Sequence, residues 1–260
     1  MIWIKDKYEI LLDHGGRVFV AARKGRYVTA MFRDRTAAGT RLAERVSRLN
    51  AENPLVIALP RGGVPVGAAI ARRLGAPLDV IVARKIGAPD QPELAIGAVA
   101  EAAGGDEDGG AAVTILNQRI IAQLGLSKRS VARLRAAKLD EVAERAARYR
   151  AGRPALAVEG RTVVLVDDGI ATGATTEAAL RALRRLQPRR IVLAVPVAPR
   201  ETIEKLRFAA DEVICLAQPE DFLAIGSFYD DFTQVEDAEV ARLLAQLAPN
   251  APGVAEPPID

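Results

Sequence analysis

The stretch VVLVDDGIATGATT, which runs from residue 163 to residue 176, decides how this chain folds. Its first four residues are apolar and predict a strand buried on both faces, and a helix is expected from about Thr175. A buried strand that leads through a short turn into a helix is the repeating unit of α/β proteins. The acids Asp167 and Asp168 fall at the carboxyl end of this strand, where open α/β sheets bind ligands.

The turn itself has the composition of a phosphate site. Thr172, Gly173, Ala174 and Thr175 are small enough for their backbone N–H groups to converge on an anion. The helix that follows adds its unpaired donors and its dipole, and the hydroxyls of Thr172, Thr175 and Thr176 can donate as well. Two neighbouring carboxylates would repel a bare polyphosphate. They suit a sugar phosphate, because they can accept hydrogen bonds from ribose hydroxyls.

Rival motifs fit these glycines less well. A Walker A loop needs a lysine after its last glycine, and no lysine follows Gly173. The glycines at positions 62, 63 and 67 have the wrong spacing for a dinucleotide-binding fingerprint. The plain alternative is an ordinary strand, turn and helix in which a threonine caps the helix.

Strands and helices alternate over most of the remaining chain, which predicts an α/β fold with a central, mainly parallel sheet flanked by helices. Strands are expected over 55–59, 78–83, 163–166, 191–195 and 213–216. Helices are expected over 36–50, 64–74, 175–186 and 199–209, and from about 236. A β-hairpin over 94–100 and 112–116 and a long helix over 127–150 interrupt this alternation, so we expect a hood insertion over about 94–152.

The sequence divides into three parts. Residues 1–30 form an extension with three β-prone runs, at 8–12, 17–21 and 26–30, which predict a small β-meander. The alternative is that translation begins at Met31. Residues 31–248 form the main domain, and the proline-containing tail 249–260 is expected to be disordered.

Composition excludes several classes of protein. The 260 residues are 50% hydrophobic and 27% charged with a net charge of +3, so a packed core is expected and a nucleic-acid partner is not indicated. The single cysteine, Cys215, and the single histidine, His14, are too few for a zinc site. No apolar run is long enough to span a membrane, and a cytoplasmic protein is expected.

The stretch at 163–176 resembles the PRPP-binding motif of the type I phosphoribosyltransferases (PRPP is 5-phosphoribosyl 1-pyrophosphate). The resemblance extends over about 32–235 and is closest to predicted members whose acceptors are unassigned. It implies the type I phosphoribosyltransferase fold, with Asp167 and Asp168 on the ribose 2- and 3-hydroxyls. It also implies that the 5-phosphate is held by Ala171, Thr172, Gly173, Ala174 and Thr175.

The same resemblance assigns a pyrophosphate side. Arg61, Gly62 and Gly63 follow the expected strand 55–59 and resemble the family's pyrophosphate loop, whereas Arg84 and Lys85 follow the next strand. The alternative for both groups is solvated charge at a strand end. The catalytic set implied is Asp167, Asp168, Arg61 and Lys85, with Mg²⁺ arriving with PRPP near the two acids rather than in a dedicated protein site.

The acceptor is the least determined part of the prediction. Phe222, Phe228, Tyr229 and Phe232 lie close together after the last expected strand and could stack on a flat base, or they could pack the helix near 236 onto the sheet. Ala171 stands where hypoxanthine–guanine enzymes carry an aspartate, which weakens a purine-salvage assignment.

The resemblance implies a homodimeric enzyme that transfers 5-phosphoribosyl from PRPP to a nitrogenous acceptor, a nucleobase, and releases pyrophosphate. The alternative is a regulator of the same fold that senses PRPP or a nucleotide and binds RNA or DNA. The basic face of the helix 127–150 motivates that alternative.

Overall fold

The computed structural model describes residues 8–12, 18–22, 30–101 and 112–249. At the N-terminus, strands β1 (Tyr8–Leu12) and β2 (Val18–Ala22) pair antiparallel, as two runs of the expected meander would. Nearly all of the third run and of the tail 249–260 lies outside the described residues, so the meander, the start at Met31 and the disordered tail stay predictions.

The main domain is built on five parallel strands in the order β10-β9-β8-β3-β4, which confirms the α/β prediction. Strands β3 and β8 are direct neighbours, with Ala58 opposite Val166 at their carboxyl ends. All of their residues are buried, as expected for a sheet covered on both faces. The strands are β3 (Leu55–Ala58), β4 (Leu78–Val80), β8 (Thr162–Val166), β9 (Arg190–Val197) and β10 (Glu212–Ala217).

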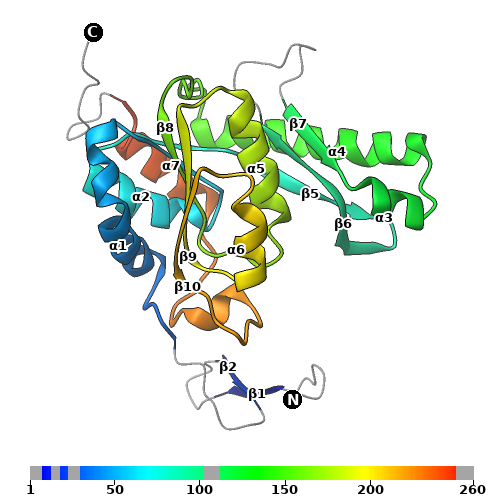
Figure 1. The fold of residues 1–260 in the computed structure, drawn as a ribbon, viewed down its shortest axis with the longest axis horizontal. Coiled ribbons are helices and arrows are strands. Elements are labelled where there is room, and N and C mark those ends of the chain that lie inside the picture. Colours follow the sequence, from blue (N-terminus) through cyan, green and yellow to red (C-terminus); the bar gives the residue numbers. More distant parts are fainter. Residues whose placement is uncertain (1–7, 13–17, 23–29, 102–111, 250–260) are drawn as a thin grey trace.

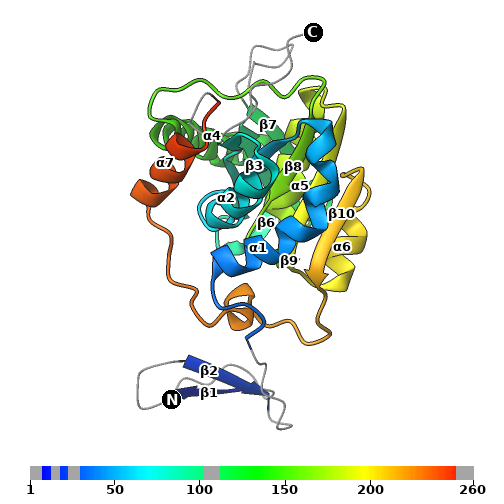
Figure 2. The same ribbon diagram turned by 90° about the vertical axis from the view of Figure 1, so that its left-hand side faces the viewer.

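Helices cover both faces of this sheet (Figures 1 and 2). Alternate strand residues point to opposite sides, so Val56 and Ala58 belong to one hydrophobic cluster whereas Leu55 and Ile57 belong to another. The first cluster is closed by α1 (Arg35–Val46), α2 (Gly63–Leu74) and α7 (Asp237–Gln246), and the second by α5 (Ala174–Arg185) and α6 (Arg200–Leu206).

The insertion forms a second, antiparallel sheet of three strands with helices beside it. Its elements are β5 (Ala83–Ala88), β6 (Gln91–Glu101), β7 (Ala112–Leu116), α3 (Gln118–Gln123) and α4 (Lys128–Arg150). The strand expected over 78–83 is in fact two strands, because β4 ends at Val80 in the parallel sheet and β5 pairs with the hairpin strand β6. We call residues 83–150 the hood, which extends to the right of the main domain in Figure 1.

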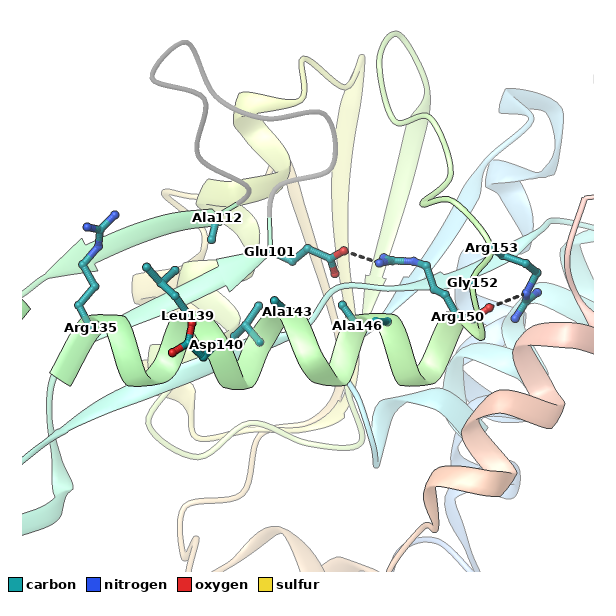
Figure 3. Close-up of a pocket in the computed structure, with 12 residues that line it drawn as sticks. Glu101, Ala112, Arg135, Leu139, Asp140, Ala143, Ala146, Arg150, Gly152 and Arg153 are labelled. Atoms are coloured by element: carbon teal, nitrogen blue, oxygen red, sulfur yellow. Dashed lines mark hydrogen bonds and ion pairs between the residues drawn. The ribbon is translucent and has the colours of Figure 1, made fainter. Parts of the chain in front are cut away.

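A buried ionic cluster fixes the end of α4 to the main sheet. Arg150 is 7% exposed, and its guanidinium donates to Asp79 Oδ1 at 2.9 Å and to the Val80 carbonyl at 2.7 Å. It also donates to Glu101 (Figure 3). Asp79 Oδ2 accepts from the backbone N–H of Leu156 at 2.8 Å. Since a buried charge is tolerated only when it is paired and hydrogen-bonded, these contacts fix where the hood leaves and rejoins the sheet.

Among the described residues, no helix is long and apolar enough to cross a membrane.

Candidate functional site

Two loops meet where β3 and β8 end. The β3 loop carries Arg61, Gly62 and Gly63, and the β8 loop carries Asp167 and Asp168. A Cβ atom on Gly62 would lie 1.9 Å from Asp168 Oδ2, and one on Gly63 would lie 2.7 Å from the carbonyl oxygen of Val166. The glycines are therefore required by close approach, and the structure brings Gly62 and Gly63 of the expected pyrophosphate loop against the two acids assigned to ribose.

Asp168 is held from several directions. It is 8% exposed, its Oδ2 accepts from Arg35 Nε at 2.7 Å, and its main-chain carbonyl accepts from the Tyr229 hydroxyl at 2.5 Å. Burial raises the pKa of this carboxyl, and the Arg35 guanidinium opposes that rise. The backbone conformation and the side chain of Asp168 are thus both fixed by residues far away in the sequence.

Asp167 lies beside Asp168, and its Oδ1 accepts from the Asp168 backbone N–H at 2.9 Å. Burial, and then the negative charge of Asp168, raise the pKa of Asp167 well above the ordinary range of an aspartate. A strongly raised pKa in a pair of adjacent acids is typical of a functional site rather than of a surface ion pair.

The expected phosphate loop, Ala171 to Thr175, leads into α5. Gly173 has φ +81°, a left-handed conformation that favours glycine, and α5 begins directly after it without a side-chain cap. Ala171 and Thr172 are exposed, so the loop is open to a ligand. Thr202 of α6 supports the loop from behind, because its hydroxyl donates to the Ala171 carbonyl at 2.8 Å.

Thr176 does not fit the role of phosphate donor that its hydroxyl suggests from the sequence. Its side chain is on the packed face of α5 and the residue is only 2% exposed. The accessible hydroxyls of this segment are those of Thr172 and the half-buried Thr175.

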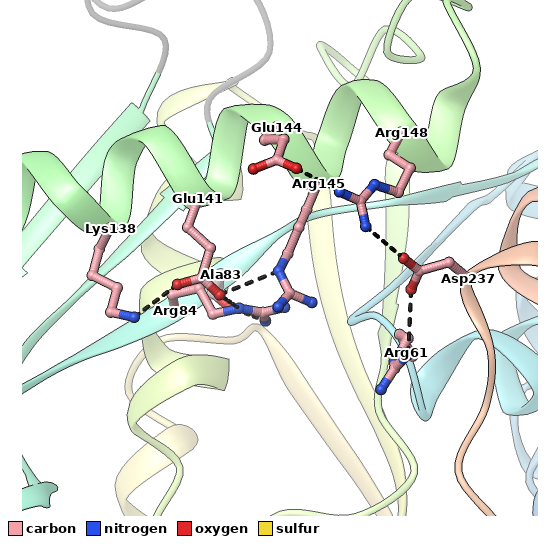
Figure 4. Close-up of polar contacts among 9 residues, drawn as sticks. All are labelled: Arg61, Ala83, Arg84, Lys138, Glu141, Glu144, Arg145, Arg148 and Asp237. Carbon is pink, nitrogen blue, oxygen red and sulfur yellow. Dashed lines mark hydrogen bonds and ion pairs between the residues drawn. The ribbon is translucent and has the colours of Figure 1, made fainter.

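Two of the cations assigned to pyrophosphate, Arg61 and Arg84, contact carboxylates of the protein (Figure 4). Arg61, which follows a cis Pro60–Arg61 peptide bond, lies 3.4 Å from Asp237 Oδ1 at the start of α7, and Arg148 of α4 contacts the same carboxylate at 3.0 Å. The guanidinium of Arg84 donates to Glu141 of α4 at 3.0 Å. Neighbouring residues of a strand point to opposite faces, so the half-buried Lys85 points away from Arg84. Their assignment to pyrophosphate stays a prediction.

The four aromatic residues assigned to the acceptor differ in accessibility. Phe228 and Tyr229 are 2% and 6% exposed and pack with Phe32, so packing accounts for these two rings. They do not pack the helix near 236 onto the sheet, as the alternative interpretation expected. Phe222 and Phe232 are half-buried at the edge of that cluster and stay candidates for an acceptor wall.

Arg35 is the site residue that sequence reasoning misses. It is the first residue of α1 and reaches Asp168 across 133 positions of sequence. No local motif marks it among the 36 lysines and arginines, and only the tertiary fold brings it to the acids.

A cavity of about 560 Å³ lies on the hood, along α4 (Figure 3). Its walls include Arg135, Leu139 and Ala143, together with Glu101 and Arg150 of the buried ionic cluster. None of the residues assigned to PRPP lines it, so we place the candidate site at the ends of β3 and β8 and not here.

The family model and the curated relatives that match this chain carry corresponding descriptions. Residues 31–233 match the family model described as "Phosphoribosyl transferase domain". Two curated proteins of Mycobacterium tuberculosis, each named "Putative phosphoribosyl transferase" (Rv0571c of strain H37Rv and MT0597 of strain CDC 1551), are 41% identical over 214 residues. This match covers 82% of the chain but 46% of each relative, so the chain spans about half the length of the curated relatives it matches.

Among solved structures, TT1426 from Thermus thermophilus is 45% identical and superposes with a TM-score of 0.69. That match covers 84% of this chain and 99% of the Thermus chain. The residues before 31 lie outside the part of the chain that the family model matches.

Proposed function

This chain belongs to the phosphoribosyl transferase domain family, and from that membership we propose that it transfers the 5-phosphoribosyl group of PRPP to a nitrogenous acceptor, a nucleobase, and releases pyrophosphate. The observation that carries the proposal is the contact between the two loops at the ends of β3 and β8. The backbone at Gly62 approaches the Asp168 carboxylate so closely that no side chain fits between them.

The two loops supply complementary parts of a sugar-phosphate site. The segment Ala171–Thr175 offers backbone donors and a helix N-terminus to the 5-phosphate. Asp167 and Asp168 accept hydrogen bonds from the ribose hydroxyls. The Gly62–Gly63 backbone and Arg61 approach the pyrophosphate at the other end of the ribose. A ligand with a phosphate at each end of a pentose therefore matches the order of groups along the site.

In the proposed reaction, the acceptor nitrogen forms a bond to the anomeric carbon of PRPP as the bond from that carbon to pyrophosphate breaks, and the N–H proton of the acceptor passes to solvent. Positive charge develops on the ribose, and the adjacent carboxylates of Asp167 and Asp168 stabilise it. Arg61 and Lys85 balance the charge of the leaving pyrophosphate. The protein's contribution is positioning and electrostatics, without a covalent intermediate.

Magnesium fits this donor set as a companion of the substrate. Mg²⁺ keeps several waters and is bound through one or two carboxylates together with substrate phosphates. The adjacent acids Asp167 and Asp168 offer that pair, and no cluster of three or more ligating side chains occurs within the described ranges. When bound, the ion would neutralise charge on the pyrophosphate, and the acids would hold the ribose beside it.

The test is calorimetric titration with PRPP and Mg²⁺, followed by measurement of pyrophosphate release with a panel of nucleobases. We expect PRPP and ribose 5-phosphate to bind, and one class of base to stimulate release. Asp167→Asn should weaken ribose 5-phosphate binding by about ten- to a hundredfold, since a hydrogen bond to a charged group is lost. Absence of any pentose phosphate binding would refute the proposal.

The homodimer implied by the resemblance is part of the proposal and is testable by light scattering on the full chain.

A further inference from the structure

We propose that Arg35 is a positioning residue for the ribose site, which orients the Asp168 carboxylate toward the sugar and joins it to the segment 228–233. This inference rests on the proposed function and adds to it a residue that the PRPP motif does not contain. Arg35 belongs to α1, on the other side of the sheet from the phosphate loop helix α5.

The guanidinium of Arg35 is held by three different contacts. Its Nε donates to Asp168 Oδ2 at 2.7 Å, its Nη1 donates to the Thr233 carbonyl at 2.7 Å, and its Cζ lies 3.8 Å from the centre of the Phe232 ring. The edge and the face of the planar group are thus both used. Lysine could keep the charge but could not make this combination of contacts.

The other side of Asp168 is fixed as well. The Gly62 backbone closes one side of the carboxylate, and Tyr229 holds the main-chain carbonyl of Asp168. With Arg35 on Oδ2, the plane of the carboxylate is determined by residues from the β3 loop, α1 and the segment 228–233. A hydrogen bond to a ribose hydroxyl depends on that plane, so Arg35 acts on the sugar through Asp168.

A purely structural role does not explain why Arg35 and Asp168 form a buried ion pair. Both side chains are only 11% exposed, and a buried ion pair often contributes no more to stability than packed apolar residues of similar size. The free energy spent on burying Arg35 is explained if the pair serves ligand binding, because Arg35 then holds the Asp168 carboxylate in the orientation that a ligand needs. Phe232, one of the candidate acceptor-wall residues, lies against the same guanidinium, so Arg35 connects the ribose side of the site to the acceptor side.

The experiment compares two ligands on the full chain. Ribose 5-phosphate uses both the phosphate loop and the acids, whereas inorganic phosphate uses the loop alone. Affinities would be measured for wild type, Arg35→Gln and Arg35→Lys. The matched control is Arg41→Gln, which removes the same charge from the same helix; Arg41 donates to the Met31 carbonyl and lies 5.0 Å from the Phe32 ring centre.

We expect Arg35→Gln to weaken ribose 5-phosphate binding by about tenfold, and Arg35→Lys by several-fold, with phosphate affinity unchanged. Arg41→Gln should change neither affinity. Unchanged or tighter ribose 5-phosphate binding in both Arg35 variants would overturn the inference, and so would an equal loss for both ligands, which would indicate only a long-range charge effect. If Arg35→Gln does not fold, Arg35→Lys alone decides between these outcomes. Failure of the wild type to bind ribose 5-phosphate would instead refute the proposed function.

Discussion

The hydroxyl of Tyr229 donates a 2.5 Å hydrogen bond to the main-chain carbonyl of Asp168. The segment after the last strand therefore supports the β8 loop, which carries Asp167 and Asp168. Burial, together with the nearby charge of Asp168, raises the pKa of this phenol and so favours its protonated form, which can donate the hydrogen bond. Tyr229 is only 6% exposed, and this hydrogen bond gives it a structural role beside the candidate site.

Tyr229→Phe should lower the free energy of unfolding by about 1–2 kcal/mol, because it leaves a buried carbonyl without its donor. Ribose 5-phosphate affinity should fall with it, since the loop that carries Asp168 loses a support. Denaturant unfolding and calorimetry measure the two effects. An unchanged unfolding midpoint would show that the hydrogen bond contributes nothing to the fold.

Arg150→Met should destabilise the protein by about 3–5 kcal/mol, because the buried Asp79 and the partly buried Glu101 would both lose the cation that pairs with them. Arg181→Met removes an exposed arginine that pairs with Glu177, and it serves as the control because it should have little effect. Thermal unfolding followed by circular dichroism distinguishes the two variants. Equal stability of Arg150→Met and wild type would mean that water reaches the cluster.

Asp167→Asn should make the protein more stable than wild type at neutral pH. The pKa of Asp167 is raised on folding, so the folded state binds the proton more tightly than the unfolded state does. The ionised group therefore opposes folding at pH values above its folded pKa. Its cost disappears as the pH falls toward the unfolded value of about 4.

The stability advantage of Asp167→Asn should therefore shrink on acidification, which urea unfolding of both proteins between about pH 8 and pH 4.5 would measure. Other carboxyls whose pKa is lowered, such as Asp34 and Glu52, are present in both proteins and cancel in the difference. An advantage that grows on acidification would contradict the raised pKa.

Gly62→Ala should abolish ribose 5-phosphate binding, because the new methyl group would lie 1.9 Å from Asp168 Oδ2 and displace the carboxylate. The control is Gly75→Ala, at the C-cap of α2, where φ is +61° and no atom of the described residues lies within 4 Å of the new Cβ. That control should cost about 1–2 kcal/mol of stability through backbone strain but leave binding intact. If Gly62→Ala bound ribose 5-phosphate as tightly as wild type does, the β3 and β8 loops would have to move apart at little cost in free energy.

The α/β fold could be predicted because strands such as 163–166 are apolar on both faces, and a short run of that kind between turn residues is typical of a covered parallel sheet. The acids and the phosphate loop could be located because they are contiguous with such a strand. The division of the strand expected over 78–83 could not be foreseen. Residues 81–83, where one strand ends and the next begins, are as buried as the residues of β4. Hydrophobicity alone therefore does not show where β4 ends and β5 begins.

Arg35 and the buried aromatic rings were beyond sequence reasoning for a related reason. Their partners lie far along the chain, and a single arginine or phenylalanine looks the same whether it faces solvent, a ligand or the core. The aromatic neighbours of Tyr229 predict a stacking surface, whereas the position of its side chain depends on Phe32 and on the Asp168 carbonyl.

The clamp of Arg150 on Asp79 makes the hood a cassette whose two chain ends are tied together at the edge of the parallel sheet. Loops and helices inside such a cassette can change in length and sequence without altering how the five parallel strands connect. Changes within the hood are therefore expected to leave the loops at the ends of β3 and β8 in place.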